Sequence, residues 1–285
     1  MNELCAIVIN YFAPDATRRC LDSLRSEIFD TVRIIDNSAD PEANQAFLKM
    51  IASFEEEPPP WELIVSVNDE NLGFGRAINR AIQADRSQGS GHRRYLLMNN
   101  DAVGKPNFAA GLVEKASESE AIALVTPRIL WGKEVVGLRW YHRLTAHIST
   151  GPLPGSFSYA TGCCLLVDER LLDEDGRLFD EEFFMYGEDV LLTWKARQRG
   201  FEVVCADAVT VEHEGSASAP HGDYFYEYHV TKGHWILGRK LYGDLWDRAS
   251  IKLCRRVYLA IRALLRSLRF RNIVAFRALR LAIRS

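Results

Sequence analysis

The feature that most constrains the fold is a regular alternation of short apolar runs with stretches of helical spacing. Four apolar runs have the length of buried strands: residues 5–9, 32–35, 63–67 and 95–98. Three stretches between them repeat apolar side chains at helical intervals: residues 17–28, 41–54 and 75–84. This alternation predicts an α/β fold, Rossmann-like, with a mostly parallel sheet and helices on both faces.

Polar side chains stand where three of these strands end. Asn10 follows the first strand and Asp36 the second, while Asn99, Asn100 and Asp101 follow the fourth. Open α/β sheets bind ligands beyond the carboxyl ends of their strands, so this placement predicts a nucleotide site. The first strand is not followed by G-x-G-x-x-G, and the chain has no G-x-x-x-x-G-K-[ST]. These absences argue against an NAD-type Rossmann enzyme and a P-loop NTPase.

The second half of the chain is less regular. A strand and turn are expected over residues 121–129, and hairpins and loops that cover the site over residues 131–158. Two further strands and two helices are expected: strands 162–167 and 201–205, and helices 188–199 and 224–242.

Five motifs stand in order between residues 6 and 218. They are VINY at 8–11, DNS at 36–38, ENLGFG at 70–75 followed by Asn79, LMNND at 97–101, and FFMYGED at 183–189 followed by His213. In these motifs the sequence resembles the family 2 glycosyltransferases of the GT-A fold, and most closely their rhamnosyltransferase-like members. The resemblance implies inverting, metal-dependent transfer of a sugar from a nucleotide diphosphate donor to a hydroxyl. It further implies rhamnose from dTDP-rhamnose as the sugar, and a growing polysaccharide or lipid-linked oligosaccharide as the acceptor.

The resemblance implies two metal ligands, Asp101 and His213. Asp101 stands where the family has its D-x-D-like motif, and a carboxylate together with the donor phosphates suits a hard divalent cation. The imidazole of His213 suits Mn²⁺ better than Mg²⁺, although either ion remains open. Without the resemblance, the alternative interpretation of Asp101 is a turn-forming residue after a strand.

The resemblance places the catalytic base at Asp189, with Glu188 beside it on the acceptor side. An inverting transfer needs a carboxylate that takes the proton of the attacking hydroxyl. Both acids also open the expected helix 188–199, where carboxylates favour the helix dipole without any catalytic role. Relatives commonly read E-D-V-D-L, whereas Leu191 replaces the second acid here, which leaves details of the acceptor side open.

The remaining residues that the resemblance implies contact the nucleotide sugar. Asp36 is expected at the base or ribose, although an Asx turn is the alternative interpretation. Asn71 and Gly73 are expected over the ribose and phosphates, and Gly162 and Cys163 beside the donor sugar. The whole expected donor set is Asn10, Tyr11, Asp36, Asn71, Gly73, Asn99, Asn100, Gly162 and Cys163.

The charge is strongly asymmetric along the chain. Residues 251–285 carry 10 Lys and Arg and no Asp or Glu, so residues 1–250 carry 35 − 10 = 25 basic against 38 acidic side chains. Seven arginines of this tail fall at intervals that predict one stripe along a continuous helix: Arg255, Arg262, Arg266, Arg269, Arg277, Arg280 and Arg284. An apolar stripe falls largely on another face: Val257, Tyr258, Ile261, Leu264, Leu265, Leu268, Phe276, Leu279 and Ile283.

A basic amphipathic helix of this kind is typical of an anchor on an anionic membrane surface. The alternative is a helix packed on the acidic body, and nucleic-acid binding is not expected because interleaved aromatic residues are missing. We therefore expect a GT-A domain over residues 1–235 and a helical segment over residues 236–285.

The start of the chain lacks the features of a signal peptide, and no apolar stretch is long enough to span a membrane. The six cysteines have no metal-binding spacing, which indicates reduced and mostly buried thiols. We expect a cytoplasmic protein, peripheral on the inner face of the cell membrane. Two other functions stay open, a nucleotidyltransferase and a non-catalytic carbohydrate- or lipid-binding scaffold.

Overall fold

The computed structural model describes residues 3–89, 91–214 and 222–284. Within these ranges a large sheet crosses the molecule in the order β3-β2-β1-β4-β11-β6-β12-β5, and β7 pairs with β6. Its strands are β1 (Leu4–Asn10), β2 (Thr31–Asp36), β3 (Glu62–Val67), β4 (Arg94–Asn99), β5 (Ala102–Gly104), β6 (Ile122–Trp131), β7 (Glu134–Val136), β11 (Cys164–Asp168) and β12 (Glu202–His213).

The pairing directions bring two distant parts of the chain to one edge of this sheet. Strand β1 is parallel to β2 and β4, and β2 is parallel to β3. Strand β11 is antiparallel to both β4 and β6, so β6 and its parallel neighbour β12 run in the direction of β4. The carboxyl end of β12 therefore lies at the same edge as the carboxyl ends of β1, β2 and β4.

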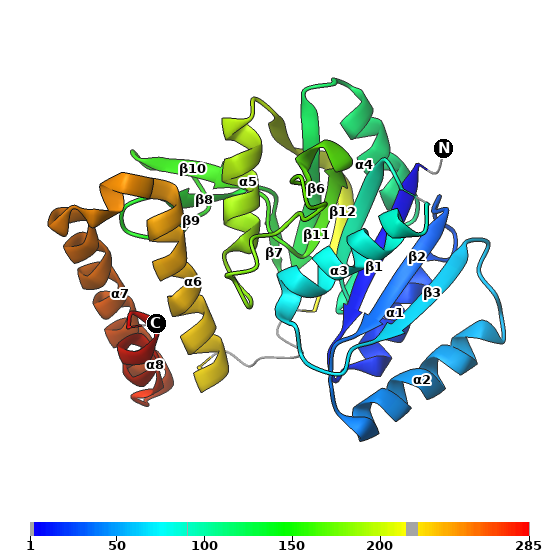
Figure 1. Cartoon of the computed structure of the whole chain (residues 1–285), viewed down its shortest axis with the longest axis horizontal. Coiled ribbons are helices and arrows are strands. Elements are labelled where there is room, and N and C mark those ends of the chain that lie inside the picture. Colours follow the sequence, from blue (N-terminus) through cyan, green and yellow to red (C-terminus); the bar gives the residue numbers. More distant parts are fainter. Residues whose placement is uncertain (1–2, 90, 215–221, 285) are drawn as a thin grey trace.

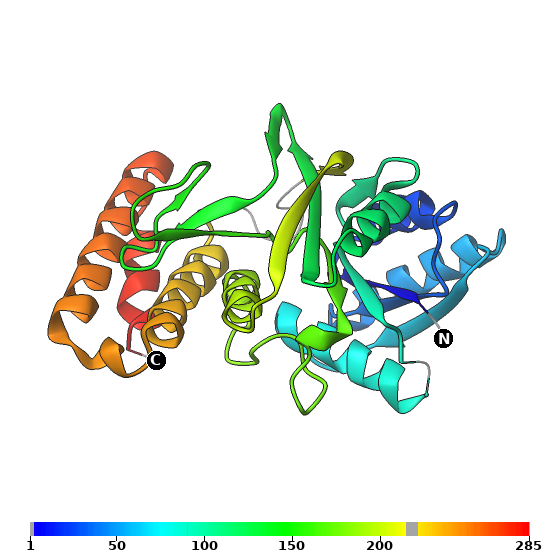
Figure 2. The same ribbon diagram turned by 90° about the horizontal axis from the view of Figure 1, so that it is seen from above.

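Helices cover both faces of the sheet, as the alternating pattern predicts. Figure 2 shows α1 (Pro14–Leu24), α2 (Pro41–Glu55) and α4 (Phe108–Ser117) on one side, and α3 (Gly73–Ser87) and α5 (Glu188–Gln198) on the other. Apolar side chains of α1, α2 and α4 form one core with the sheet, and those of α3 and α5 form a second. The fold is thus the expected α/β fold with helices on both faces.

A third layer extends the molecule beyond α5. A small antiparallel sheet of β8 (Arg139–His142), β9 (Ile148–Ser149) and β10 (Ser156–Tyr159) packs there with α6 (Tyr224–Tyr242). Helices α7 (Ala249–Phe270) and α8 (Val274–Ala282) follow, and a short 3₁₀ helix at Gly243–Asp247 joins α6 to α7. Another short 3₁₀ helix, Glu169–Leu171, follows β11. Helix α7 lies at the end of the molecule opposite α2 (Figure 1). Among the described residues, the structure contains no helix with the length and apolarity needed to span a bilayer.

The structure corrects several element boundaries. Helix α1 begins before Thr17, at Pro14, and ends at Leu24 rather than Ile28. Strand β12 continues far beyond Cys205 and ends at His213, so this histidine is the last residue of a strand rather than a residue after one. Helix α6 has the expected bounds, Tyr224–Tyr242, so the division expected at residue 235 falls inside a helix.

The prediction of one continuous helix in the tail is wrong. Arg271 adopts a left-handed backbone conformation with φ of 53°, which ends α7. The side chain of Asn272 then accepts a hydrogen bond of 3.0 Å from the Val274 amide and starts α8. An Arg-Asn pair can therefore break a pattern whose apolar periodicity continues on both sides, because Arg271 leaves the helical backbone conformation and the Asn272 side chain bonds to a backbone amide two residues on, as in an Asx turn.

All six cysteines are free, as expected. Cys5, Cys20, Cys163 and Cys164 are buried, and the other two are half-buried. Burial raises the pKa of the Cys205 thiol to about 11, and it raises the pKa of the four buried thiols further. Their low thiolate content makes them packing residues rather than nucleophiles.

Candidate active site

A cavity of about 600 Å³ opens at the carboxyl edge of the sheet. It lies between the ends of the strands, the small sheet, the start of α5 and the first turns of α6. The residues predicted from sequence line it, with the exception of Asn10 and Asp36: Tyr11, Asn71, Gly73, Asn99, Asn100, Asp101, Gly162, Cys163, Glu188, Asp189 and His213. The structure therefore brings motifs from both halves of the chain into one place.

Asp101 and His213 meet at this edge, where β12 and β5 pair. Strand β5 pairs with the end of β12 so that Ala102 stands opposite His213, and the Glu214 amide donates to the Asp101 carbonyl at 3.0 Å. As a result, Oδ1 of Asp101 lies 3.1 Å from Nε2 of His213, and the two side chains are only 9% and 12% exposed. The ring of Trp131 packs edge-on against His213 at 5.5 Å.

This pair fits a divalent cation. A carboxylate oxygen and an imidazole nitrogen are ligands that Mn²⁺ accepts, and a hard cation also takes phosphate oxygens. The two atoms already converge on the cavity wall, on a backbone fixed by strand pairing. The residues present therefore suit the metal that the sequence predicts.

Asn10 and Asp36 lie beneath the cavity rather than in its wall. Both side chains are completely buried. The amide of Asn10 donates to Oδ1 of Asp36 at 2.9 Å, and the hydroxyl of Ser38 donates to the same oxygen at 2.6 Å. Thr17 donates to Asn10 and accepts from Asn100, which does line the cavity. In this structure the two residues stabilise the strand ends, and a contact of Asp36 with the base or ribose remains a proposal.

Asn37, which the sequence reasoning missed, holds the loop over the cavity. Its amide nitrogen donates to Oδ1 of Asn71 at 2.9 Å and to the Gly73 carbonyl at 3.2 Å. Its oxygen accepts from the Asn68 side chain and the Leu72 amide. Its place directly after Asp36 in DNS was the available signal, because an amide that both donates and accepts suits a loop junction.

Gly73 is required by its backbone and by its surroundings. It has φ of +75°, and a Cβ built there would lie 2.1 Å from the Phe184 carbonyl oxygen, which also accepts from the Phe74 amide. We expect Gly73→Ala to lower the free energy of unfolding by at least about 2 kcal/mol, because left-handed backbone strain adds to a backbone clash. Urea unfolding of the wild type and of Gly73→Ala measures this difference in free energy.

Gly200→Ala is the matched control for that variant. Gly200 has a similar φ of +84°, but nothing lies within 4 Å of the position that a Cβ would take there. It should therefore lose only the free energy of the left-handed backbone strain, about 1 kcal/mol. Equal losses in the two variants would show that the contact with Phe184 is unimportant.

Asp189 lines the same cavity as the acid–imidazole pair, from the start of α5. Its Oδ2 accepts a hydrogen bond of 3.0 Å from the Gly162 amide. The next residue, Cys163, accepts from the Asn99 amide at 2.9 Å through its carbonyl, which ties the same segment to the end of β4. The segment Gly162–Cys163 thus stands between the candidate base and the candidate metal ligands, where a donor sugar is expected.

Glu188 and Asp189 form a carboxyl pair in which Glu188 is buried and Asp189 is half-buried at the cavity wall. Burial raises the pKa of Asp189 above its ordinary value, although the Gly162 and Val190 amides oppose this by stabilising the charged form. Burial raises the pKa of Glu188 further, and the charge of Asp189 adds to that shift. Oε2 of Glu188 is buried with no hydrogen-bond partner among the residues described. Asp189 is thus the more readily ionised of the two.

The departure at Leu191 has a structural explanation. Its side chain is 2% exposed and belongs to the apolar cluster formed by α5, α6 and the small sheet. An acid at this position would be buried among apolar side chains without an evident partner, at considerable cost. The missing second acid therefore reflects packing of α5 against α6, and Asp189 itself is unaffected.

Asn79 holds in place the segment that leads to the FFMYGED motif at residues 183–189. Its side-chain oxygen accepts from the Leu178 and Phe179 amides at 3.0 and 2.9 Å, and its nitrogen donates to the Phe179 carbonyl. The residue is completely buried and anchors the segment that leads to residues 183–189. Its contribution to the site is to position that segment.

Sequence reasoning also missed an aromatic wall on the α6 side of the cavity. Tyr186 and Tyr226 line it, with ring centroids 5.3 Å apart. Tyr159 and Arg139 line it from the small sheet. Tyr186 stood inside a quoted motif and could have been singled out, whereas the others lie in segments without a recognisable pattern.

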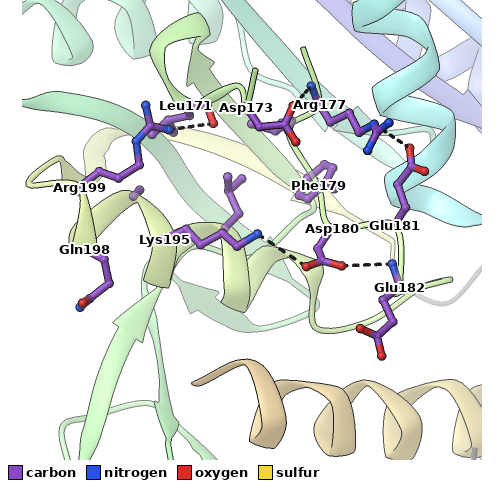
Figure 3. Close-up of a pocket in the computed structure, with 13 residues that line it drawn as sticks. Leu171, Asp173, Arg177, Phe179, Asp180, Glu181, Glu182, Lys195, Gln198 and Arg199 are labelled. Atoms are coloured by element: carbon purple, nitrogen blue, oxygen red, sulfur yellow. Dashed lines mark hydrogen bonds and ion pairs between the residues drawn. The ribbon is translucent and has the colours of Figure 1, made fainter. Parts of the chain in front are cut away.

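A second cavity, of about 570 Å³, contains none of these residues. It lies beside the segment before residue 183 and the outer face of α5. Figure 3 shows its charged side chains facing one another, including Lys195 directed at Asp180. Lys240 also pairs with Asp180, at 2.8 Å. Because most of its charged side chains are paired, this cavity is a weaker candidate for the active site than the first one.

Another cluster of potential metal ligands lies inside the core. Atoms of Cys5, Asp85 and His92 lie within 4.8 Å of one another. However, Asp85 is already paired with the buried guanidinium of Arg33 at 3.1 Å, and it accepts from Tyr95 at 3.0 Å. A cation beside Arg33 would be repelled, so this cluster is a structural hydrogen-bond network.

Comparison with known proteins gives the family of the chain. The model of the glycosyl transferase family 2 matches residues 5–176. The chain belongs to this family. It is thus a glycosyltransferase, and the family favours glycosyl transfer over the nucleotidyl transfer that the sequence left open.

The O-antigen biosynthesis protein RfbC of Myxococcus xanthus is 25% identical over 244 residues, which cover 75% of this chain. The match spans only 18% of that longer relative.

Two solved structures support the GT-A fold. A mannosyltransferase from Pyrobaculum calidifontis in complex with GDP-Man and Mn²⁺ has a TM-score of 0.61 and 14% identity, over 94% of this chain and 75% of that one. Residues 1–349 of TarS from S. aureus have a TM-score of 0.50 and 15% identity, over 99% of this chain and 90% of that one. At this identity the likeness shows the fold alone.

Proposed function

We propose that this glycosyltransferase is inverting and metal-dependent, and that it transfers a sugar from a nucleotide diphosphate to a hydroxyl of a polysaccharide or lipid-linked oligosaccharide. One observation carries the proposal. The Asp101–His213 pair and Asp189 line the same cavity, and the segment Gly162–Cys163 is hydrogen-bonded to the Asp189 carboxylate and to Asn99, two residues before Asp101.

Asp189 acts as the base in this proposal. It takes the proton of the acceptor hydroxyl while the oxygen attacks the anomeric carbon and the bond to the diphosphate breaks. Attack from the face opposite the leaving diphosphate inverts the anomeric centre. Asp101 and His213 would hold the divalent cation, which when bound offsets the charge that develops on the diphosphate.

The aromatic wall is our candidate for the acceptor side. Tyr186 and Tyr226 lie next to the carboxyl pair, where an incoming sugar must approach Asp189. An aromatic ring combines an apolar face with a polar hydroxyl, which suits the mixed surface of a sugar ring. Glu188 lies at the same place and belongs to this side of the site.

The comparisons support the substrate class but leave the sugar open. The M. xanthus relative is named for O-antigen biosynthesis, and the mannosyltransferase neighbour holds GDP-Man and Mn²⁺. We propose a nucleotide sugar as donor, with dTDP-rhamnose as the first candidate from the sequence resemblance. A lipid-linked acceptor would also require a peripheral position on the inner face of the membrane.

A panel of nucleotide sugars tests the proposal directly. Each donor is titrated by calorimetry with Mn²⁺, Mg²⁺ or a chelator, and release of nucleoside diphosphate is followed with glycan acceptors. Metal-dependent binding of one donor, with inverted product, supports the proposal. Donor binding without turnover on any acceptor would favour the non-catalytic scaffold instead. If no nucleotide bound, the cavity would not be a donor site.

The pH dependence of transfer should report the carboxyl pair. Asp189 must be ionised to accept a proton, and burial raises its pKa above the ordinary value. The rate should therefore fall as pH falls, with the acidic limb well above about pH 4, where an exposed aspartate titrates. Measurements of kcat under saturating substrates test this, and a limb at the ordinary aspartate pKa would contradict the assignment.

A further inference from the structure

Three arginines of the predicted stripe face the body of the protein from α7. Arg255 is completely buried and donates to the Tyr141 hydroxyl at 2.9 Å. Arg262 and Arg266 are 16% and 17% exposed, and both pair with Glu227, whose side chain is 1% exposed. A buried carboxylate needs such partners, and guanidinium groups supply several donors each. Glu227 on α6 therefore fixes which side of α7 packs on the body.

This orientation turns the apolar stripe of α7 toward solvent. We call it the α7 apolar face: Leu253, Val257, Ile261, Leu264, Leu265 and Leu268, which are between 48% and 68% exposed. At about 100° of turn per residue, these side chains span an arc of about 120°. Arg256 and Arg269, both exposed, stand about 60° and 40° beyond the two borders of that arc.

The exposed charges that follow residue 252 in the tail all have one sign. Within residues 251–284, six arginines are exposed and there is no Asp or Glu: Arg256, Arg269, Arg271, Arg277, Arg280 and Arg284. A second copy of this chain would bring the same cations against them, which like-charge repulsion disfavours. An apolar arc bordered by cations is complementary to lipid headgroups of negative charge above acyl chains.

We propose that the α7 apolar face is the part of the chain that binds an anionic lipid surface, with α7 lying in the plane of the interface. The leucines enter the boundary of the acyl chains, and the bordering arginines meet the headgroup phosphates. The proposal refines the expected basic amphipathic anchor, because three arginines of the predicted stripe contact the body, as in the alternative of a packed helix, and the face left for lipid is the apolar one.

The same helix is connected to the active site through α6. The guanidinium of Arg266 lies over the ring of Tyr226, 5.0 Å from its centroid, and Tyr226 lines the cavity. A membrane bound at α7 would thus be separated from the acceptor side of the cavity by one helix, α6. The link to a lipid-linked acceptor rests on the proposed function, whereas lipid binding itself can be measured without donor or acceptor.

Flotation of the whole chain with vesicles tests the proposal. Wild type is expected to float with vesicles of phosphatidylcholine and phosphatidylglycerol, and much less with phosphatidylcholine alone. The double variant Leu265→Ser/Leu268→Ser should lose about tenfold or more in partition, because two exposed leucines no longer enter the membrane. Arg256→Gln/Arg269→Gln should lose a similar factor on anionic vesicles, since each cation near the surface contributes about fivefold.

Leu48→Ser is the matched control, because Leu48 is 48% exposed on α2 at the other end of the molecule. It should float like wild type. Absence of wild-type flotation, or equal loss in Leu48→Ser, overturns the proposal. So does a wild-type dimer that the double leucine variant converts to monomer without lipid binding, since the face would then join two copies. Transfer to a soluble acceptor, assayed separately, reports the proposed function alone.

Discussion

Replacing Asp189 by Asn is expected to slow sugar transfer by about 10²- to 10⁴-fold and to leave donor affinity nearly unchanged. Asn keeps the size of the side chain, and its oxygen can still accept the hydrogen bond that the Gly162 amide donates to Asp189. It cannot take the proton of the acceptor hydroxyl. Single-turnover kinetics with saturating donor measure the loss, and calorimetry measures donor affinity.

Glu188→Gln is the matched comparison for that variant. The pKa of Glu188 is raised above that of Asp189 by burial and by the neighbouring charge, so its neutral form is favoured near pH 7. A neutral Gln resembles that form, and the loss of rate should be much smaller. If Glu188→Gln stopped transfer while Asp189→Asn did not, the base would be Glu188.

The centre of the site could be predicted because its residues lie at strand ends. Asp101 follows β4, and strand direction alone places it at the ligand-binding edge. His213 needed the resemblance, because β12 could be recognised only over its first residues and a lone histidine carries little information. The partnership of the two residues depends on the pairing of β5 with β12, which involves a strand too short to recognise.

Burial of individual polar residues could not be predicted in the same way. Asp36 stands at a strand end like Asp101, yet it is enclosed by Asn10 and Ser38, whereas its neighbour Asn37 reaches the cavity. Successive side chains leave a strand end in different directions, so a shift of one residue exchanges the two roles. The sequence located the motif, but it did not tell which residue contacts the ligand.

The orientation of α7 also could not be predicted from the sequence. Helical periodicity separates an apolar face from a basic one, and it does not tell which of them meets the body. The deciding residue is Glu227, a buried acid on another helix that requires Arg262 and Arg266 as partners. An unpaired buried carboxylate would cost several kcal/mol, about as much as burying two or three leucines gains. The free energy gained by pairing Glu227 with Arg262 and Arg266 therefore competes with the free energy that burying the apolar face of α7 would give.

Asp101→Ala is expected to abolish metal-dependent donor binding, with a loss of about 100-fold or more in affinity, because even outer-shell partners of a metal contribute about 10- to 100-fold. His213→Ala should lose less, since Asp101 and the donor phosphates would still supply oxygen ligands. Calorimetric titration of nucleoside diphosphate with Mn²⁺ or chelator measures both. Chelator should weaken binding to wild type and have no further effect on Asp101→Ala.

Two features of the chain make this test decisive. His213 is 12% exposed and stands at the end of β12, whose backbone is paired with β5, so the variant should fold like wild type. Asp180→Ala is the comparison for a lost carboxylate elsewhere, because Asp180 lines the second cavity and pairs with Lys195 and Lys240. It should bind donor normally. If Asp101→Ala also bound donor with wild-type affinity and the same response to Mn²⁺, then the pair at the strand ends would not be the metal site, and the proposed role of the cation would have to be assigned to other residues of the cavity.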